Sequence, residues 1–275
     1  MKYLTSGIHL FAIQVLLCAG TARGDVIAAW HFDELAGLTA FAAAGSVDGA
    51  LMGDASFLAG GISGGAVNMT TGGNGLVDMG NNFSFDGNST FSIVAWFQLN
   101  NGDSNGYMIA GRHQSTVAAG YFLSVNDIGS ASGEVAGGGS FFQSYPNPVS
   151  ANLGLNDGGW HQVVGVHDFA ANQTQLYVDG ILRDTKPYNP FAASAANFAV
   201  GGIFNPAGTQ MVGILTGAAD EVSIWDNALN STQVAYLYNN PGALAVPEPT
   251  ALAVLNGVAI LVFARRRQRS RHSRP

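Results

Sequence analysis

The sequence predicts an all-β protein folded as a two-sheet sandwich, with one short helix near the C-terminus and a separate hydrophobic tail. Three observations support this class. Short apolar runs follow one another at regular spacing, clusters of Gly, Asn and Asp separate them, and no helical block lies between them. Glycine is abundant at 37 residues, which suits a chain with many tight turns.

The stretch from Trp160 to Gly180 is the clearest pair of strands. Its first run, WHQVVGVHDF, has apolar residues on both parities, so this strand belongs inside a sheet rather than at an edge. Its second run ends in Asp179-Gly180. That pair predicts a type I′ hairpin turn, because both central residues of such a turn need a positive φ.

The other elements follow from the same alternation of apolar runs and turn residues. Residues 129–159 are rich in Gly, Ser and Asn, so weak strands and long loops are expected there. Asn230 with Gln233 three positions later predicts the start of a helix, and Asn239–Gly242 ends it. Strands are predicted at 26–32, 66–69, 75–79, 91–99, 107–111, 121–126, 198–202 and 221–225, and Trp30, Trp96, Trp160 and Trp225 are predicted to lie in the core.

Charge and cysteine content narrow the function classes. Between Asp25 and Val246 the chain has 17 acidic residues against Arg112, Arg183 and Lys186, a net charge of about −14. Such a surface repels phosphate backbones, which argues against nucleic acid as a partner. The only cysteine, Cys18, lies in a segment expected to be removed, so stability must come from core burial or bound metal.

Both ends of the chain have features of export. Residues 1–24 combine Lys2 with an apolar run and small residues before Asp25, which predicts a secretory signal peptide. Residues 25–242 form the predicted domain, and residues 243–275 form the tail. The tail has an apolar run at 250–264, which as a helix spans about 22 Å, short of the roughly 30 Å hydrocarbon core. Six arginines follow within the ten residues that end at Arg274, and they orient the tail towards the cytoplasm.

The segment Gly158–Gly180 resembles the central signature of the laminin-G-like (LamG), concanavalin A-like family, in which a Trp-His strand is followed by Leu-Tyr-Val-Asp-Gly. Further segments occur in the family's order. The resemblance covers roughly residues 25–242 and implies an antiparallel jelly-roll sandwich. The further segments are Trp30–Glu34, Gly64–Val67, Phe91–Phe97, Phe198–Gly202 and Ala219–Trp225.

The tail resembles the PEP-CTERM sorting signal of Gram-negative bacteria. The resemblance rests on a Pro-Glu-Pro motif, a short weak span and an arginine-rich end. It implies a transient anchor in the inner membrane, processing by an exosortase-type enzyme, and delivery to the cell surface or an exopolysaccharide matrix. A plain single-pass anchor is the alternative. The motif residues are Pro247, Glu248, Pro249, Arg265, Arg266 and Arg267.

Catalysis is not expected. In the laminarinase-like branch of this fold, two carboxylates come from alternate positions of one strand, and no acidic residue of the domain is followed two positions later by another. The adjacent pairs Asp33-Glu34 and Asp220-Glu221 are expected to point to opposite faces. Carboxylates that converge from separate strands stay open as an alternative. His161 and His167 share a face about 20 Å apart, too far for one metal.

Calcium (Ca²⁺) is the cofactor that the family resemblance implies. It points to Asp48, in the Asp48-Gly49 turn, and to Asp220 as ligands. Loops rich in Asp, Asn and free carbonyl oxygens suit this cation. The loop at 39–44 departs from the family because it lacks the Asp often found there, and Asp220 as a turn or hydrogen-bonding residue is the alternative.

A glycan site needs exposed aromatic rings for stacking, with amides nearby. Tyr145 with Asn147, and Tyr188 with Asn189, lie in loops of this kind and are the predicted ligand-binding residues. We therefore expect a non-catalytic protein of the cell surface or matrix that binds a polysaccharide or a surface protein. A glycan-active hydrolase of the same fold and a purely structural matrix protein are the alternatives.

Overall fold

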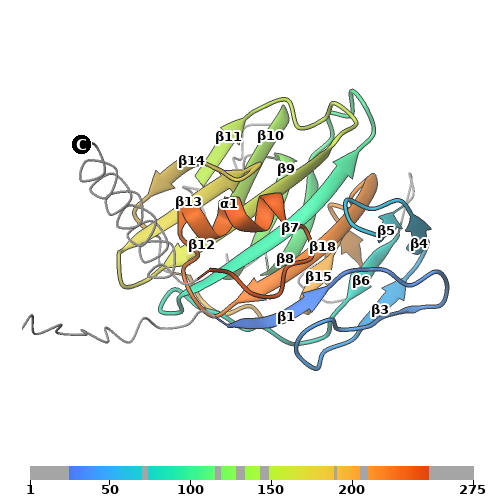
Figure 1. Cartoon of the computed structure of the whole chain (residues 1–275), viewed down its shortest axis with the longest axis horizontal. Coiled ribbons are helices and arrows are strands. Elements are labelled where there is room, and N and C mark those ends of the chain that lie inside the picture. The colour runs from blue at the N-terminus through green and yellow to red at the C-terminus, as the bar shows by residue number, and fades with distance from the viewer. Residues whose placement is uncertain are drawn as a thin grey trace, which may run out of the picture.

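The computed structural model describes residues 25–69, 74–114, 119–127, 134–142, 149–188, 191–204 and 210–247. In these residues the chain forms two antiparallel sheets that pack face to face, and one short helix (Figure 1). The predicted all-β sandwich with a single helix near the C-terminus is confirmed.

The first sheet is built around the longest strands. In spatial order it contains β14 (Ile181–Lys186), β13 (Gln173–Val178), β12 (Trp160–Asp168), β7 (Phe91–Leu99), β18 (Gly217–Trp225), β5 (Gly65–Met69) and β4 (Ser56–Ala59), and β1 (Val26–Trp30) also pairs with β18.

The second sheet covers the inner face of the first. In spatial order it contains β11 (Val149–Asn152), β10 (Glu134–Phe142), β9 (Ala119–Asp127), β8 (Tyr107–Gln114), β15 (Ala199–Val200), β6 (Leu76–Asp78), β3 (Gly49–Met52) and β2 (Thr39–Ala40). A small ribbon of β16 (Ile203–Phe204) and β17 (Met211–Val212) lies beside β8.

The main core lies between the two sheets and is rich in aromatic rings. Trp30 lies 6.2 Å from Phe198, centroid to centroid, and Phe91 lies 4.6 Å from Tyr121. In each pair the first ring comes from a strand of the first sheet. The second ring comes from β9 of the second sheet (Tyr121) or from the residue directly before its strand β15 (Phe198). Of the four tryptophans predicted in the core, Trp30, Trp96 and Trp225 are buried. Trp160 is only half-buried, because it begins β12 at the end of the sheet.

The outer face of the first sheet is covered by helix α1 (Ser231–Asn239), as Figure 1 shows. Val164 and Val166 of β12 pack there against Val234 and Leu237 of the helix. This second, smaller core explains why β12 is apolar on both parities. The predicted cap is confirmed: Asn230 accepts hydrogen bonds from the backbone of Thr232 and Gln233, and Gln233 binds back to it.

The hairpin prediction at Asp179-Gly180 is also confirmed. Asp179 has φ 52° and Gly180 has φ 75°, so both residues have the positive φ of a type I′ turn. The strand that follows, β14, was not predicted. Its residues are mostly exposed and polar, so the sequence lacks an apolar run there.

Residues 129–159 contain more strand than expected. The nine-residue strand β10 and the shorter β11 lie at one edge of the second sheet. Their Gly- and Ser-rich sequence has weak intrinsic strand preference, so pairing with β9 determines the structure. Strand β3 was likewise not among the predicted strands.

The prediction that Asp220 and Glu221 point to opposite faces is wrong. A β-bulge in β18 places two residues, Glu221 and Val222, opposite one residue of β7. Glu221, which has φ 48°, is the extra residue of the bulge. Val222 therefore faces the inter-sheet core, and both carboxyl groups lie on the outer side of the first sheet.

Several predictions concern the ends of the chain. The signal peptide at 1–24 and the tail from Glu248 onwards lie outside the described residues. Within the described ranges, no helix is long and apolar enough to cross a membrane.

One strand glycine sets the distance between the sheets. A Cβ at Gly165 of β12 would lie 2.4 Å from the ring of Phe141 in β10. We expect Gly165→Ala to lower the free energy of unfolding by about 1–3 kcal/mol, because the ring must move within a packed core. Urea denaturation measures this change. Ala50→Val, at an exposed position of β3, is the control, and equal stability of both variants would contradict the expectation.

Candidate functional site

Aromatic rings gather at one rim of the sandwich, where β12 ends. Four side chains, His167, Phe169, Tyr188 and Phe191, form what we name the rim aromatic cluster. The ring of Tyr188 lies 5.6 Å from that of Phe169 and 5.4 Å from that of His167, and His167 lies 5.4 Å from Phe191. His167 is fully buried, whereas Phe169 is 41% exposed. The cluster therefore extends from the core to the surface.

Backbone contacts hold the loops of this rim together. His167 Nδ1 donates to the carbonyl oxygen of Ser89 at 2.7 Å, and the backbone N–H of Phe169 donates to Thr90 Oγ1 at 3.2 Å. The backbone N–H of Gly87 donates to the carbonyl oxygen of Phe191. Burial lowers the pKa of His167, so its ring is neutral at pH 7. The neutral imidazole is fixed in place and supports the outer rings from below by packing against them.

The structure places one predicted ligand-binding residue in this cluster. Tyr188 is half-buried and contacts the exposed Phe169. Asn189, Tyr145 and Asn147 lie outside the described residues. Phe169 was not predicted as a site residue, because it was assigned to the strand. Its place directly after Asp168, at the start of a turn rich in Ala and Asn, is the signal that would have identified it.

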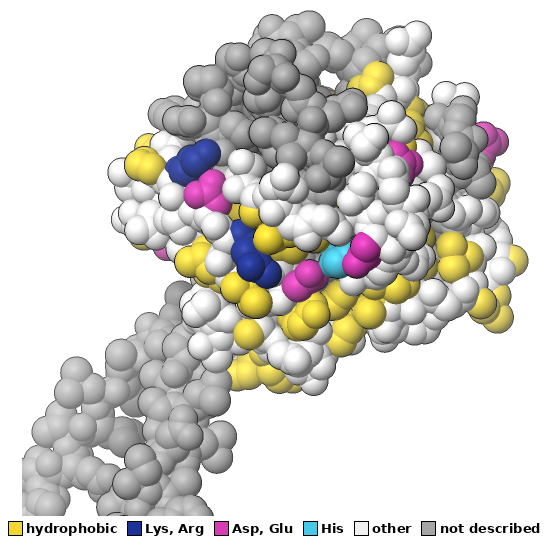
Figure 2. Space-filling view, turned by 90° about the horizontal axis from the view of Figure 1, so that it is seen from above, with side chains coloured by type: hydrophobic (Ala, Val, Ile, Leu, Met, Phe, Trp, Pro, Cys, Tyr) yellow, Lys and Arg dark blue, Asp and Glu magenta, His cyan; other side chains and the backbone are white. Residues whose placement is uncertain are grey.

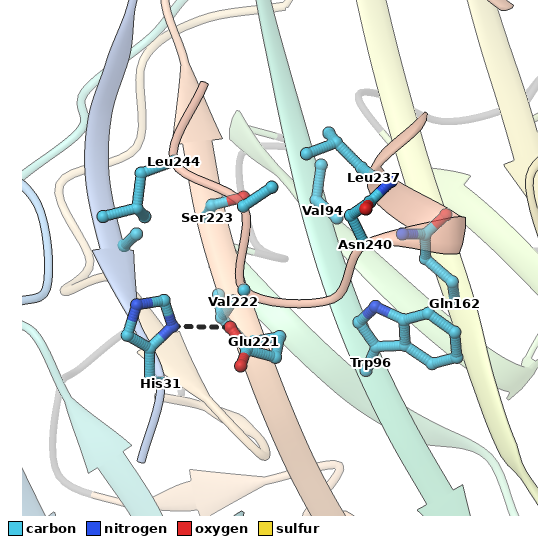
Figure 3. Close-up of a pocket in the computed structure, with 13 residues that line it drawn as sticks. His31, Val94, Trp96, Gln162, Glu221, Val222, Ser223, Leu237, Asn240 and Leu244 are labelled. Atoms are coloured by element: carbon cyan, nitrogen blue, oxygen red, sulfur yellow. Dashed lines mark hydrogen bonds and ion pairs between the residues drawn. The ribbon is translucent and has the colours of Figure 1, made fainter. Parts of the chain in front are cut away.

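A pocket lies on the outer face of the first sheet, under α1 and the segment that follows this helix (Figure 3). Its cavity volume of about 10 Å³ has room for one water molecule and none for a sugar ring. His31 Nδ1 lies 2.6 Å from Glu221 Oε2 at one end, and Gln162 and Trp96 lie at the other. Both amide atoms of Gln162 are buried without a protein partner, which suits a single ordered water.

The chain segment after α1 closes this pocket. Gly242 lies so close to the pocket floor that a Cβ there would be 2.9 Å from Glu221 Oε1. Glu221 is buried and already paired with His31, which raises the pKa of that histidine. The carboxylate is therefore not open to a substrate in this conformation.

Asp33 and Asp220 hold the glycine-rich loop between β4 and β5. Asp33 Oδ1 accepts from the backbone N–H of Gly65 at 2.7 Å, and Asp220 Oδ2 accepts from that of Ser63 at 3.2 Å. A Cβ at Gly61 would lie 2.3 Å from Asp220 Oδ2. A side chain at position 61 would therefore clash with Asp220, which gives a physical reason for a glycine in this loop.

Calcium was predicted at Asp48 and Asp220, and the two residues have separate roles in the structure. Asp48 is exposed, and its Oδ1 accepts from the backbone N–H of Ala42 at 2.9 Å. Asp220 is fully buried; burial and the neighbouring Glu221 raise its pKa to about 8. In the described ranges no three His, Asp or Glu side chains gather as a metal site. These residues do not fit a calcium cage, and calcium binding stays a prediction.

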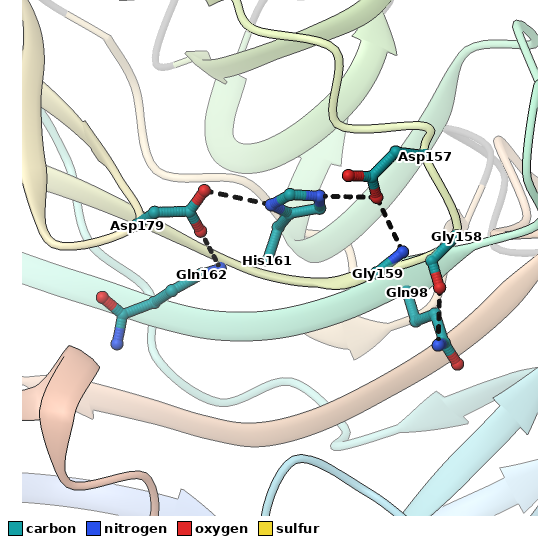
Figure 4. A network of polar contacts seen from close by, with 7 residues as sticks. All are labelled: Gln98, Asp157, Gly158, Gly159, His161, Gln162 and Asp179. Carbon is teal, nitrogen blue, oxygen red and sulfur yellow. Dashed lines mark hydrogen bonds and ion pairs between the residues drawn. The ribbon is translucent and has the colours of Figure 1, made fainter.

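His161 forms a second polar network at the start of β12 (Figure 4). Its Nδ1 lies 3.0 Å from Asp179 Oδ2, and its Nε2 lies 3.1 Å from Asp157 Oδ1. Both carboxylates raise the pKa of His161, chiefly through the hydrogen bond that the ring makes to Asp179. The ring joins the loop before β12 to the β13–β14 turn.

Comparison with known proteins was informative for the fold. The family model described as the concanavalin A-like lectin/glucanases superfamily matches residues 71–235. No curated protein matches the chain at a significant level. Domain 4 of AbnA, an extracellular arabinanase from Geobacillus stearothermophilus solved in complex with arabinotriose, is 17% identical; the match covers 78% of this chain and 99% of that one, with a TM-score of 0.55.

Two toxin domains have the same fold. The receptor binding domain of botulinum neurotoxin type G is 13% identical over 78% of this chain and 51% of its own, with a TM-score of 0.53. The binding domain of Paraclostridial mosquitocidal protein 1 is 12% identical over 78% and 52%, with a TM-score of 0.55. This chain therefore spans about half the length of these toxin domains, and the likeness concerns the fold alone.

Removal of the Asp220 carboxyl tests its role in the loop between β4 and β5. We expect Asp220→Ala to lower the free energy of unfolding by about 1–3 kcal/mol, because buried backbone N–H groups lose their acceptor. Thermal unfolding of the full chain, with calcium and with chelator, measures this. Asp48→Ala, at an exposed carboxylate, is the control. A calcium-dependent rise in the midpoint that disappears in Asp220→Ala would instead identify the carboxylate as a metal ligand.

The histidine networks predict a pH dependence of stability. A raised pKa in the folded state gives stability that is fully present below the unfolded value of 6.5 and is lost as the pH rises through the folded value. His161 should therefore stabilise the parent protein more at about pH 6 than at about pH 8.5. His161→Gln should reduce this difference, whereas Gln173→Ala, exposed on β13, should not. Urea denaturation at both pH values measures it, and an unchanged difference in His161→Gln would reject this role.

Proposed function

The chain belongs to the concanavalin A-like lectin/glucanases superfamily, and we propose that it is a non-catalytic glycan-binding protein. The observation that carries this proposal is the rim aromatic cluster, in which Phe169 is 41% exposed beside Tyr188. Exposed aromatic faces supply large contact area to an apolar sugar face at little entropic cost. The loops around them offer amide and hydroxyl groups, among them Asn88, Thr90 and Gln173.

Structural relatives support a binding role. Domain 4 of the arabinanase was solved with arabinotriose, and the botulinum neurotoxin domain is named as a receptor binding domain. This chain matches almost the whole length of the arabinanase domain. A free-standing module of this fold whose ligand is a polysaccharide is consistent with these relatives.

The buried carboxyl groups support a role without catalysis. A glycosidase needs two carboxyl groups that reach the sugar, about 5 Å or more apart on its two sides. Asp220 is used by the loop between β4 and β5, and Glu221 is paired with His31 beneath the segment after α1. Neither group is exposed to a bound glycan.

We further propose that the protein acts outside the cell. Residues 1–24 would direct export, and the tail at 243–275 would hold the protein briefly in the inner membrane until an exosortase-type enzyme recognises Pro247, Glu248 and Pro249. The mature protein would then reach the cell surface or the extracellular matrix of a Gram-negative bacterium. The sequence features of both ends support this delivery.

A surface protein is the second candidate partner, and a specific observation favours it. The loop after β1 exposes three large apolar side chains: Leu35 is 87% exposed, Leu38 is 69% exposed and Phe41 is 61% exposed. Contiguous exposed apolar residues on a charged domain often mark a contact with another protein. This apolar loop lies in a different part of the chain from the rim aromatic cluster.

The two candidate surfaces predict different mutant behaviour. We expect Tyr188→Ala and Phe169→Ala to weaken binding to a soluble polysaccharide by about tenfold each, because each removes one stacking ring. Affinity gel electrophoresis of the full chain in arabinan, xylan and β-glucan measures this. Tyr188→Phe keeps the ring and should retain binding.

Phe41→Ala is the matched control for Phe169→Ala, since both replace an exposed phenylalanine. Its binding should equal that of the parent. Loss of binding in Phe41→Ala with full binding in Phe169→Ala would move the site to the apolar loop. Equal binding of all variants would reject the rim aromatic cluster as the glycan site.

A further inference from the structure

We propose that the ligand of the rim aromatic cluster is an electrically neutral polysaccharide, bound as a single flexible chain and not as a crystalline surface. This inference rests on the proposed function and names the class of glycan. Two independent features carry it: the distribution of charged side chains and the angle between the two outer rings.

The first step concerns Arg112, one of three basic residues in the domain. Arg112 is fully buried, and its guanidinium donates to the carbonyl oxygens of Asn82 and Ser194 and to Asn81 Oδ1. It joins two loops across the second sheet. Its donors are therefore directed at the protein itself and cannot reach an anionic sugar.

The other two basic residues, Arg183 and Lys186, both lie on β14. Lys186 Nζ lies 3.6 Å from Asp184 Oδ2, which already offsets its charge. Figure 2 shows one side of the molecule, on which the basic side chains lie in one part of the surface with acidic side chains beside them. Proteins recognise carboxylate and sulfate groups mainly with Arg and Lys. In the described part of the chain such groups are confined to this edge strand, and Lys186 lies only two residues before Tyr188. The basic group nearest to the cluster in sequence is thus one whose charge Asp184 offsets.

Acidic groups lie close to the rim aromatic cluster. Asp86 and Asp168 both act on His167 at the base of the cluster, where their charges oppose the effect of burial on its pKa. The backbone N–H of Asn88 holds the pKa of Asp86 below its usual range, so this carboxylate is ionised at neutral pH. An anionic sugar stacked on Phe169 and Tyr188 would meet the negative charge of Asp168, which directly precedes Phe169 in the chain. Repulsion follows, whereas a neutral sugar meets hydrogen-bond acceptors for its hydroxyl groups.

The angle between the outer rings distinguishes a single chain from a flat surface. The planes of Tyr188 and Phe169 meet at 67°. A crystalline glycan presents a flat sheet of sugar rings, and two rings can stack on it together only if they are nearly coplanar. Rings at this angle can both stack only on a chain that turns between one sugar and the next. The geometry therefore favours a soluble, twisted chain.

Comparison of four probes tests the inference with the full chain. The probes are neutral arabinan and neutral β-glucan, anionic polygalacturonate, and crystalline cellulose. The arginines that end at Arg274 can bind polyanions by themselves, so only binding that is lost in Tyr188→Ala is attributed to the rim aromatic cluster. We expect Tyr188-dependent binding to a neutral soluble polysaccharide. It should be unaffected by salt and at least about tenfold tighter than any Tyr188-dependent binding to polygalacturonate.

Two results would overturn the inference while leaving the proposed function intact. They are tighter Tyr188-dependent binding to polygalacturonate than to the neutral glycans, and Tyr188-dependent retention on crystalline cellulose alone. Absence of Tyr188-dependent binding to all four probes would instead reject the proposed function at this site. Tyr188→Phe, which should bind like the parent, shows whether a loss in Tyr188→Ala reflects the ring or a folding defect.

Discussion

The aromatic contacts around Phe91 are the interaction on which the rest of the structure depends. Phe91, on the central strand β7, stacks on Phe85 at 4.4 Å, contacts Tyr121 at 4.6 Å and Phe141 at 6.1 Å across the sandwich, and stacks on His167 at 5.6 Å. The only cysteine of the sequence lies at position 18, so no disulfide can stabilise residues 25–247. Stability must come from burial of such rings. Because His167 belongs to the same group of contacts, the rim aromatic cluster is the outer end of the core.

The same packing decides where a ligand cannot bind. Long central strands with apolar residues on both faces need cover on both sides, and α1 with the segment after it supplies the outer cover. Beneath α1 and this segment a cavity of about 10 Å³ remains, and its polar side is lined by Gln162, Glu221 and His31. The part of the outer face beneath α1 is therefore closed to a sugar. Loops at the rim are a common place for recognition where a rigid scaffold presents them.

The sequence predicted the features that local chemistry determines. The Asp179-Gly180 turn, the Asn230 cap and the strand at 91–99 depend on neighbouring residues only, and the structure contains all three. It predicted only weak strands where the nine-residue β10 lies and did not predict β14, and both exist because partner strands are present. It also missed the bulge at Glu221, because the extra residue is defined only by the register with β7. Of the candidate site, Tyr188 was predicted from its loop, whereas Phe169 needed the three-dimensional contact with it.

Aspartate has a structural function throughout this domain, and that function accounts for its surface charge. The side chains of many described acidic residues accept a hydrogen bond from a backbone N–H in a turn or loop. A carboxylate satisfies such donors better than a neutral group does. A chain with many short strands has many such donors, so the requirements of its loops alone produce a strongly acidic surface. The charge is thus a consequence of the fold, and it disfavours polyanions before any ligand-binding group is considered. The acceptors in turns and loops are Glu34, Asp48, Asp78, Asp86, Asp103, Asp157, Asp168 and Asp226.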